Sequence, residues 1–165
     1  MNTLKIKEIT LENFNKYGTF ADMINPTACK IGEEPVEFYR DMLQLSFGQS
    51  SIGSFSICRV LERPLIVDTI EFHTLAGEGT LPLDGDILLS VAPATANGDV
   101  PDDRIEVFHV PKGTMVTIYP GVWHSAPFTY NTDFVNVLIV LPERIYANDC
   151  IIIKISEEKQ LKIDR

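Results

Sequence analysis

The chain has 165 residues, a size at which one folded domain buries about 70% of the surface that its unfolded form exposes. Hydrophobic residues make up 45% and charged residues 22%, far from the balance of a disordered chain. With 23 acidic and 14 basic side chains the net charge is -9, which argues against binding to nucleic acid or to an anionic membrane. We expect one domain, residues 1–165, that could hold a small anion only in a locally positive pocket.

The cysteines and the hydrophobic segments indicate the compartment. Cys29, Cys58 and Cys150 are odd in number and widely spaced, so we expect reduced thiols rather than a disulfide framework. The first residues carry acidic side chains and lack the apolar core of a signal peptide. The apolar run at residues 135–141 is too short to span a membrane. These features predict a cytoplasmic protein.

The first third of the chain mixes element types. Alternating apolar and charged residues predict a strand at residues 4–9. Thr10 can then cap a short helix at residues 11–16, which Tyr17 and Gly18 end. Residues 25–35 contain two prolines and a glycine and indicate a loop. The apolar spacing of residues 36–47 fits either a helix or a long strand.

The remainder reads as a series of short strands separated by turns. We expect strands at residues 52–60, 65–73, 86–91, 104–110, 114–119, 134–141 and 150–155. The segments AGEGT, PLDG, APATANGDVPDD, PKG, PGV and YNTD between them have turn composition. The tail, residues 156–165, is expected to be frayed or a short helix. Many short strands at this spacing favour a sandwich or barrel over alternating strands and helices.

Two places concentrate residues that could carry chemistry. Glu71 and His73 lie two apart on an expected strand, so their side chains share one face. If that face lines a barrel interior, burying both groups is costly unless a metal or ligand compensates. The second place is residues 113–124, an expected strand between two tight turns that ends in Trp123 and His124.

Together these residues resemble the two motifs of the cupin superfamily. The first appears as Glu71-x-His73-x4-Glu78-x6-Gly85, with Glu in place of the usual first His, and the second keeps Gly113, Gly121 and His124. The resemblance implies an all-β cupin double-stranded β-helix (jelly-roll barrel) with one or two short helices. It also implies a divalent transition metal, with no organic cofactor, on Glu71, His73, Glu78 and His124.

Over most of its length the sequence is similar to the ureidoglycolate lyase family. The matching stretches are residues 14–18, 35–41, 56–59, 64–75, Pro82, Gly85, 122–124 and 132–134. The chain departs from the family's common residues at Cys58, Glu78 and Asp84. The resemblance implies an enzyme of allantoin degradation, within purine metabolism, that cleaves ureidoglycolate, or a related small hydroxy or ureido acid, to glyoxylate and urea.

This reaction implies three roles. Glu71 or Glu78 would be the base that takes the proton of the carbinol hydroxyl, and His124 or His73 the acid that protonates the departing nitrogen. Arg59 would bind the carboxylate, because its planar guanidinium matches a carboxylate in bidentate fashion. A metal could instead polarise the hydroxyl or the carboxylate.

Other interpretations stay open on the sequence. Trp123 and Tyr119 are candidate substrate contacts, although a tryptophan here could equally be a packing residue. The chain could be another metal-dependent cupin enzyme, an isomerase or a dioxygenase, or a cupin that binds a small molecule without turnover. Because the strand edges of an open jelly roll must be covered, we expect a homodimer.

Overall fold

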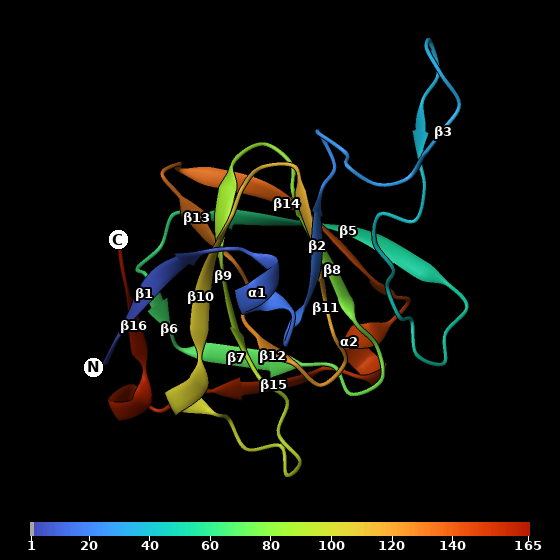
Figure 1. Ribbon diagram of the computed structural model, residues 1–165. Helices are drawn as coiled ribbons and strands as arrows, with labels where there is room; N and C mark the ends of the chain where they lie inside the picture. Colours follow the sequence, from blue (N-terminus) through green and yellow to red (C-terminus); the bar gives the residue numbers. More distant parts are fainter. Residues whose placement is uncertain (1) are drawn as a thin grey trace.

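The computed structural model describes residues 2–165, and its main feature is two β-sheets packed face to face (Figure 1). The larger sheet has the strand order β15 (Ile151–Lys154), β7 (Thr69–Phe72), β12 (Trp123–His124), β9 (Asp86–Ala92), β10 (Glu106–Val110), β1 (Asn2–Glu8), β16 (Leu161–Asp164), β6 (Ile66–Val67), with β13 (Phe128–Tyr130) also pairing with β9. The smaller sheet has the order β2 (Gly18–Asp22), β11 (Thr114–Ile118), β8 (Glu78–Pro82), β14 (Phe134–Pro142), β5 (Gly53–Leu61).

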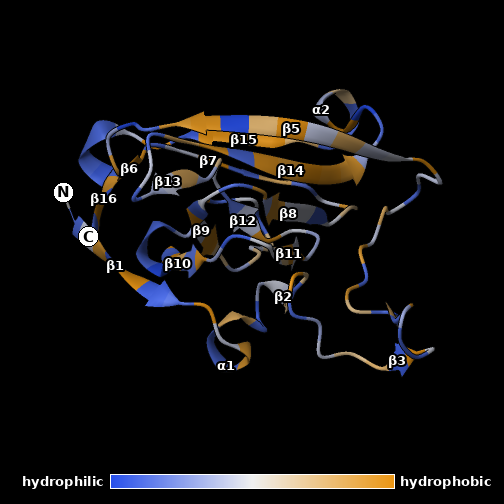
Figure 2. Cartoon of the chain, turned by 90° about the horizontal axis from the view of Figure 1, so that it is seen from above, coloured by the Kyte–Doolittle hydropathy of each residue, from blue (hydrophilic) through white to orange (hydrophobic). Residues whose placement is uncertain are grey.

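The other elements are short. Helix α1 spans Leu11–Phe14 and helix α2 spans Ile145–Asn148, with 3₁₀ turns at Asp102–Arg104 and Glu157–Lys159. Strands β3 (Lys30–Ile31) and β4 (Phe38–Tyr39) form a separate two-stranded arm that extends away from the sheets in both views (Figures 1 and 2). Among the described residues, no helix is long and apolar enough to cross a membrane.

Alternating side chains divide the apolar residues of the larger sheet between two cores. Phe108 and Val110 of β10 point to a core between the sheets, where they meet Val116 of β11 and Val137 of β14. Val107, the residue before Phe108, belongs to a second core on the outer face of the larger sheet. That outer core is covered by the carboxyl-terminal strand β16 and by β6 and β13.

Helix α1 is confirmed with the expected cap. The side chain of Thr10 accepts a hydrogen bond from the backbone N–H of Asn13, and the side chain of Asn13 accepts one from the N–H of Thr10. The helix ends earlier than residue 16, because only Phe14 of this turn is buried. Its ring packs edge-on against Phe108, with centroids 5.2 Å apart, and this contact anchors the turn to the main core.

The all-β cupin jelly roll is confirmed, and most predicted strands lie within two residues of their expected positions. The 65–73 strand is interrupted at Asp68 into β6 and β7. The segment AGEGT is a turn only in its first half, because β8 starts at Glu78 and pairs with β11 and β14. Of residues 36–47 only β4 is regular. All three cysteines are free thiols.

The expectation of a frayed or helical tail is wrong. After the 3₁₀ turn at Glu157–Lys159 the chain forms β16, which pairs in parallel with β1 and antiparallel with β6. Leu161 and Ile163 alternate with charged residues and enter the outer core. The pattern is too short to be recognised as a strand, and its stability comes from these distant partners.

Candidate active site

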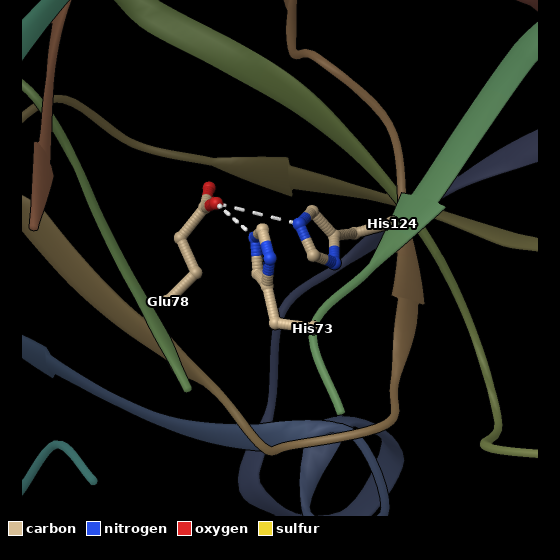
Figure 3. Close-up of side chains that lie close together, drawn as sticks. All are labelled: His73, Glu78 and His124. Carbon is tan, nitrogen blue, oxygen red and sulfur yellow. Dashed lines mark hydrogen bonds and ion pairs between the residues drawn. The ribbon is translucent and has the colours of Figure 1, made fainter. Parts of the chain in front are cut away.

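Three polar side chains converge between the two sheets (Figure 3). Oε2 of Glu78 lies 3.4 Å from Nε2 of His73 and 3.3 Å from Nε2 of His124. All three residues are buried, and one ligand atom of each lies within 4.8 Å of the others. We call this group the His–Glu–His cluster.

The sheet topology creates the cluster from three separate strands. His73 directly follows β7 and His124 ends β12, and both strands belong to the larger sheet. Glu78 opens β8 in the smaller sheet, opposite Ile118 of β11. Because the two sheets face each other, the carboxylate reaches the imidazoles across the space between them.

Backbone carbonyls fix the orientation of both imidazoles. Nδ1 of His73 lies 2.7 Å from the carbonyl oxygen of Asp149, and Nδ1 of His124 lies 3.0 Å from that of Val122. A carbonyl only accepts hydrogen bonds, so each Nδ1 carries a hydrogen and each neutral ring directs the Nε2 lone pair into the cluster. Nε2 of His124 has no hydrogen-bond partner within residues 2–165.

When both imidazoles are neutral, the cluster lacks a positive charge. Two imidazole lone pairs and a carboxylate face one another at 3.3–3.4 Å, and such a group is stable only with a proton or a cation among its members. Burial alone would lower the pKa of His124, but the Glu78 carboxylate outweighs this and raises it to about 9. Burial would raise the pKa of Glu78, but His124 and His73 keep it far below its ordinary value.

The cluster fits a metal ion by its chemistry. Two imidazole nitrogens and one carboxylate oxygen suit a divalent transition metal. The outer contacts have the pattern found around metal ligands, in which a second hydrogen bond orients each ligand. The hydroxyl of Thr80 donates to Oε1 of Glu78 at 3.0 Å, which leaves Oε2 turned toward the imidazoles.

Glu71 lies beside the cluster without belonging to it. It is the direct cross-strand neighbour of His124, so both side chains share one face of the larger sheet. The thiol of Cys150 donates to Oε2 of Glu71 at 3.3 Å. Burial and the Glu71 carboxylate raise the pKa of Cys150 to about 12, so the sulfur stays protonated and acts as a donor.

A pocket of about 510 Å³ opens next to Glu71. Ser125, which follows His124 in the chain, also lines it, so two residues adjacent to the cluster, Glu71 and Ser125, border the pocket. Its wall is formed by Cys58, Arg59, Val60, Leu61, Glu62, Arg63, Asp68, Thr69, Ile70, Glu71, Ser125, Ala126, Pro127, Phe128 and Ile152. The volume suits a small organic molecule.

Comparison with known proteins identifies the family. The family model described as ureidoglycolate lyase matches residues 1–162. The chain belongs to the ureidoglycolate lyase family. The curated ureidoglycolate lyase of Pseudomonas aeruginosa strain LESB58 is 28% identical over 171 residues, covering 99% of this chain and 97% of the relative. That of Rhodobacter capsulatus is 29% identical over 127 residues, covering 76% and 78%.

One solved structure has the same fold as this chain. The dTDP sugar isomerase from Desulfovibrio desulfuricans G20 superposes with a TM-score of 0.52 over 86% of this chain and 87% of the isomerase. Its sequence identity is 15%, so the likeness concerns the jelly roll and not the reaction.

The structure brings some of the residues implied by the ureidoglycolate lyase resemblance together and separates others. His73, Glu78 and His124 meet, and Glu71 adjoins them outside the group of convergent ligand atoms. Arg59 borders the pocket, but it is exposed on the outer face of β5, where its Nε donates to Oδ1 of Asn136 at 2.9 Å.

The two aromatic candidates, Trp123 and Tyr119, lie away from the pocket. Trp123 is fully buried in the outer core, packs on Phe72 with ring centroids 4.3 Å apart and donates from Nε1 to Thr95. Its neighbour His124 points the other way, as adjacent strand residues do. Tyr119 is 43% exposed in the turn after β11 and does not line the pocket.

Sequence reasoning missed three residues of the site. Asp149 binds His73 from 76 positions away in the chain. Cys150, expected only to be a reduced thiol, contacts Glu71. Arg63 lines the pocket. No spacing rule links these residues to the cupin motifs, because the fold alone brings them near.

Proposed function

We propose that this protein cleaves ureidoglycolate to glyoxylate and urea in the pocket beside Glu71. The observation that carries the proposal is the position of Glu71. In a member of the ureidoglycolate lyase family, it is a carboxylate on the pocket wall, adjacent to a buried His–Glu–His cluster but not engaged by its imidazoles. This position supports a role for Glu71 as a base next to a candidate cation site.

The His–Glu–His cluster would hold a divalent transition metal through Nε2 of His73, Nε2 of His124 and a carboxylate oxygen of Glu78. Such an ion supplies Lewis acidity toward the oxygen atoms of a bound hydroxy acid. The cluster side chains then serve as ligands, so proton transfer falls to another group in the pocket.

Glu71 is that group in our proposal. Its carboxylate takes the proton of the carbinol hydroxyl, the C–O bond becomes C=O, and the C–N bond breaks with its electron pair moving to nitrogen. The protonated Glu71 then returns this proton to the nitrogen, so that glyoxylate and urea leave with atoms and charge balanced. The Cys150 thiol orients the carboxylate by its hydrogen bond. The alternative in which His124 is the acid applies only if the site holds no metal, because His124 is a metal ligand in this proposal.

The test is glyoxylate release from ureidoglycolate by protein purified without a nickel column. Glu71→Gln keeps the size of the side chain but removes the base, and we expect kcat to fall roughly 10²- to 10⁴-fold. Glu33→Gln, on the exposed segment before β4, is the matched control and should behave like the wild type. No glyoxylate from the wild type would overturn the proposed reaction, and an active Glu71→Gln would overturn the role of Glu71.

We also propose that the protein is a homodimer that pairs through β5. This nine-residue strand is the edge of the smaller sheet, and it exposes Phe55, Ile57 and Leu61 on its outer face. Figure 2 shows β5 beside β14, whose Phe134 is 48% exposed. A long apolar edge strand is open to further pairing, and antiparallel pairing with its own copy gives a closed twofold interface.

A further inference from the structure

The pocket contains a cation without an acidic partner. Arg63 follows β5 and is partly buried, with its guanidinium carbon 3.8 Å from the centroid of the Phe128 ring. Its Nη2 donates to the carbonyl oxygens of Ala126 at 2.9 Å and Pro127 at 3.0 Å. These contacts, one ring face and two carbonyls, fix the plane of the guanidinium at the pocket wall.

The same contacts leave most of its donors free. Within residues 2–165, no hydrogen bond uses Nε or Nη1 of Arg63, and no carboxylate forms an ion pair with it. The Asp68 carboxylate, on the same wall, has an electrostatic effect on the Arg63 charge but forms no direct ion pair with it. A partly desolvated cation without a counter-ion is costly, and burial correspondingly lowers the pKa of Arg63. The ring, the two carbonyls and Asp68 compensate this cost only in part, and no carboxylate of residues 2–165 forms an ion pair with Arg63, so an anion from solution is the expected partner.

The position of Arg63 differs from that of Arg59, the other arginine at the pocket. Arg59 is exposed, and its Nε is already bonded to Asn136. Arg63 is stacked, oriented and partly desolvated, which is the arrangement in which a guanidinium binds a carboxylate with two parallel hydrogen bonds.

We propose that Arg63 binds the carboxylate of the substrate, and that it thereby selects small monocarboxylic acids. This inference rests on the proposed function, because it places the carboxylate on Arg63 and the reacting hydroxyl near Glu71, on the wall of the same pocket. Glu62, Asp68 and Glu71 give the rest of the pocket a negative charge. A second carboxylate would meet these groups, so dicarboxylates bind less well than monocarboxylates.

The first experiment measures binding rather than turnover. Calorimetric titration compares glycolate with glycolamide, which replaces the carboxylate by a neutral amide of nearly the same shape. We expect the wild type to bind glycolate about 10- to 100-fold more tightly, as charge-assisted hydrogen bonds predict, and Arg63→Gln to lose this preference. A preference retained in Arg63→Gln, or absent from the wild type, would overturn the inference.

Three further variants make the result specific. Arg63→Lys keeps the positive charge but not the planar guanidinium with its parallel donors, so it should retain only part of the preference for glycolate over glycolamide. This variant also tests the inference if Arg63→Gln does not fold. Arg40→Gln, near the arm and exposed, is the matched control. Arg59→Gln tests the competing arginine, and a loss as large as that of Arg63→Gln would contradict our assignment.

Turnover of ureidoglycolate separates this inference from the proposed function. If the wild type releases glyoxylate, Arg63→Gln should raise KM about 10- to 100-fold with a smaller change in kcat. A changed kcat with an unchanged KM would contradict carboxylate binding by Arg63. If the wild type releases no glyoxylate but distinguishes glycolate from glycolamide through Arg63, the reaction is wrong and the carboxylate site stands.

Discussion

The backbone carbonyl of Asp149 accepts a hydrogen bond from Nδ1 of His73, at 2.7 Å. The carboxylate of the same residue accepts hydrogen bonds from the backbone N–H groups of Thr74, Leu75 and Ala76, the residues that follow His73. Burial would raise the pKa of Asp149, but a hydrogen bond from the hydroxyl of Thr74 and these backbone hydrogen bonds outweigh it and lower the pKa. Asp149 thus orients the imidazole and the loop that leads from His73 to Glu78.

Asp149→Ala removes the carboxylate while leaving the carbonyl in place. We expect the loop at residues 74–76 to loosen and the affinity for a divalent metal to fall roughly 10- to 100-fold, as for other groups that orient ligands. The free energy of unfolding of the variant should be about 1–3 kcal/mol lower than that of the wild type. Metal competition titration and urea unfolding measure the two effects. Asp149→Asn keeps one acceptor oxygen, so it should lose less metal affinity and less stability than Asp149→Ala. An unchanged metal affinity in Asp149→Ala would refute the positioning role.

His124→Ala removes one of the three convergent ligands. We expect its metal content, measured by mass spectrometry on protein purified without a nickel column, to fall well below that of the wild type. His109→Gln is the control, because His109 lies outside the cluster, between Glu8 and Asp86. Equal metal content in wild type and His124→Ala would show that the cluster is not the metal site.

Trp123→Phe tests whether the tryptophan packs or binds substrate. The change removes the hydrogen bond to Thr95 and part of the contact with Phe72 in the outer core. We expect about 1–3 kcal/mol lower stability on urea unfolding, with KM for ureidoglycolate within about twofold of the wild type. A large rise in KM with unchanged stability would restore the role in substrate binding.

His109 should make stability depend on pH. Burial would lower its pKa, but the hydrogen bonds and charges of Asp86 and Glu8 outweigh this and raise it. Protonated His109 therefore stabilises the folded state fully below its ordinary pKa of about 6.5, and this contribution disappears as the pH rises through the raised value. We expect about 1 kcal/mol or less, since Glu8 is mostly exposed.

The measurement is the free energy of unfolding of wild type and His109→Gln between pH 6 and pH 9. The difference between the two proteins isolates His109, because His124 titrates in both. The difference should be largest at pH 6 and shrink toward pH 9. A difference that is constant across this range would show that the ion pairs of His109 contribute no pH-dependent stability.

Ile57→Lys tests the proposed dimer. Ile57 is 57% exposed near the middle of β5, and a lysine there places like charges close together across a twofold interface. We expect light scattering to give twice the chain mass for the wild type and one chain mass for the variant. A wild type that is monomeric at micromolar concentration, or a dimer unaffected by the substitution, would contradict pairing through β5.

Predictability from the sequence differed between strands for a physical reason. Strands 86–91 and 134–141 were predictable because they are strongly apolar and bounded by turn residues, and these features are local. Strand β8 was missed because its Gly79 and Thr80 resemble a turn, yet they pair with β14 and β11. The tail strand β16 depends on pairing with β1 from the other end of the chain, which no local pattern encodes.

For the site, the family, the jelly roll and the candidates His73, Glu78 and His124 can be predicted from the linear chain, because the spacing of the motifs is a local property of the sequence. Which side chains share the pocket depends on how the two sheets pack. The tertiary structure left Arg59 exposed at the border of the pocket, bonded to Asn136, and it turned Trp123 into the outer core, since adjacent strand residues point in opposite directions. It also brought Arg63 and Asp149 to the site, because contacts between distant segments form only when the two sheets close on each other.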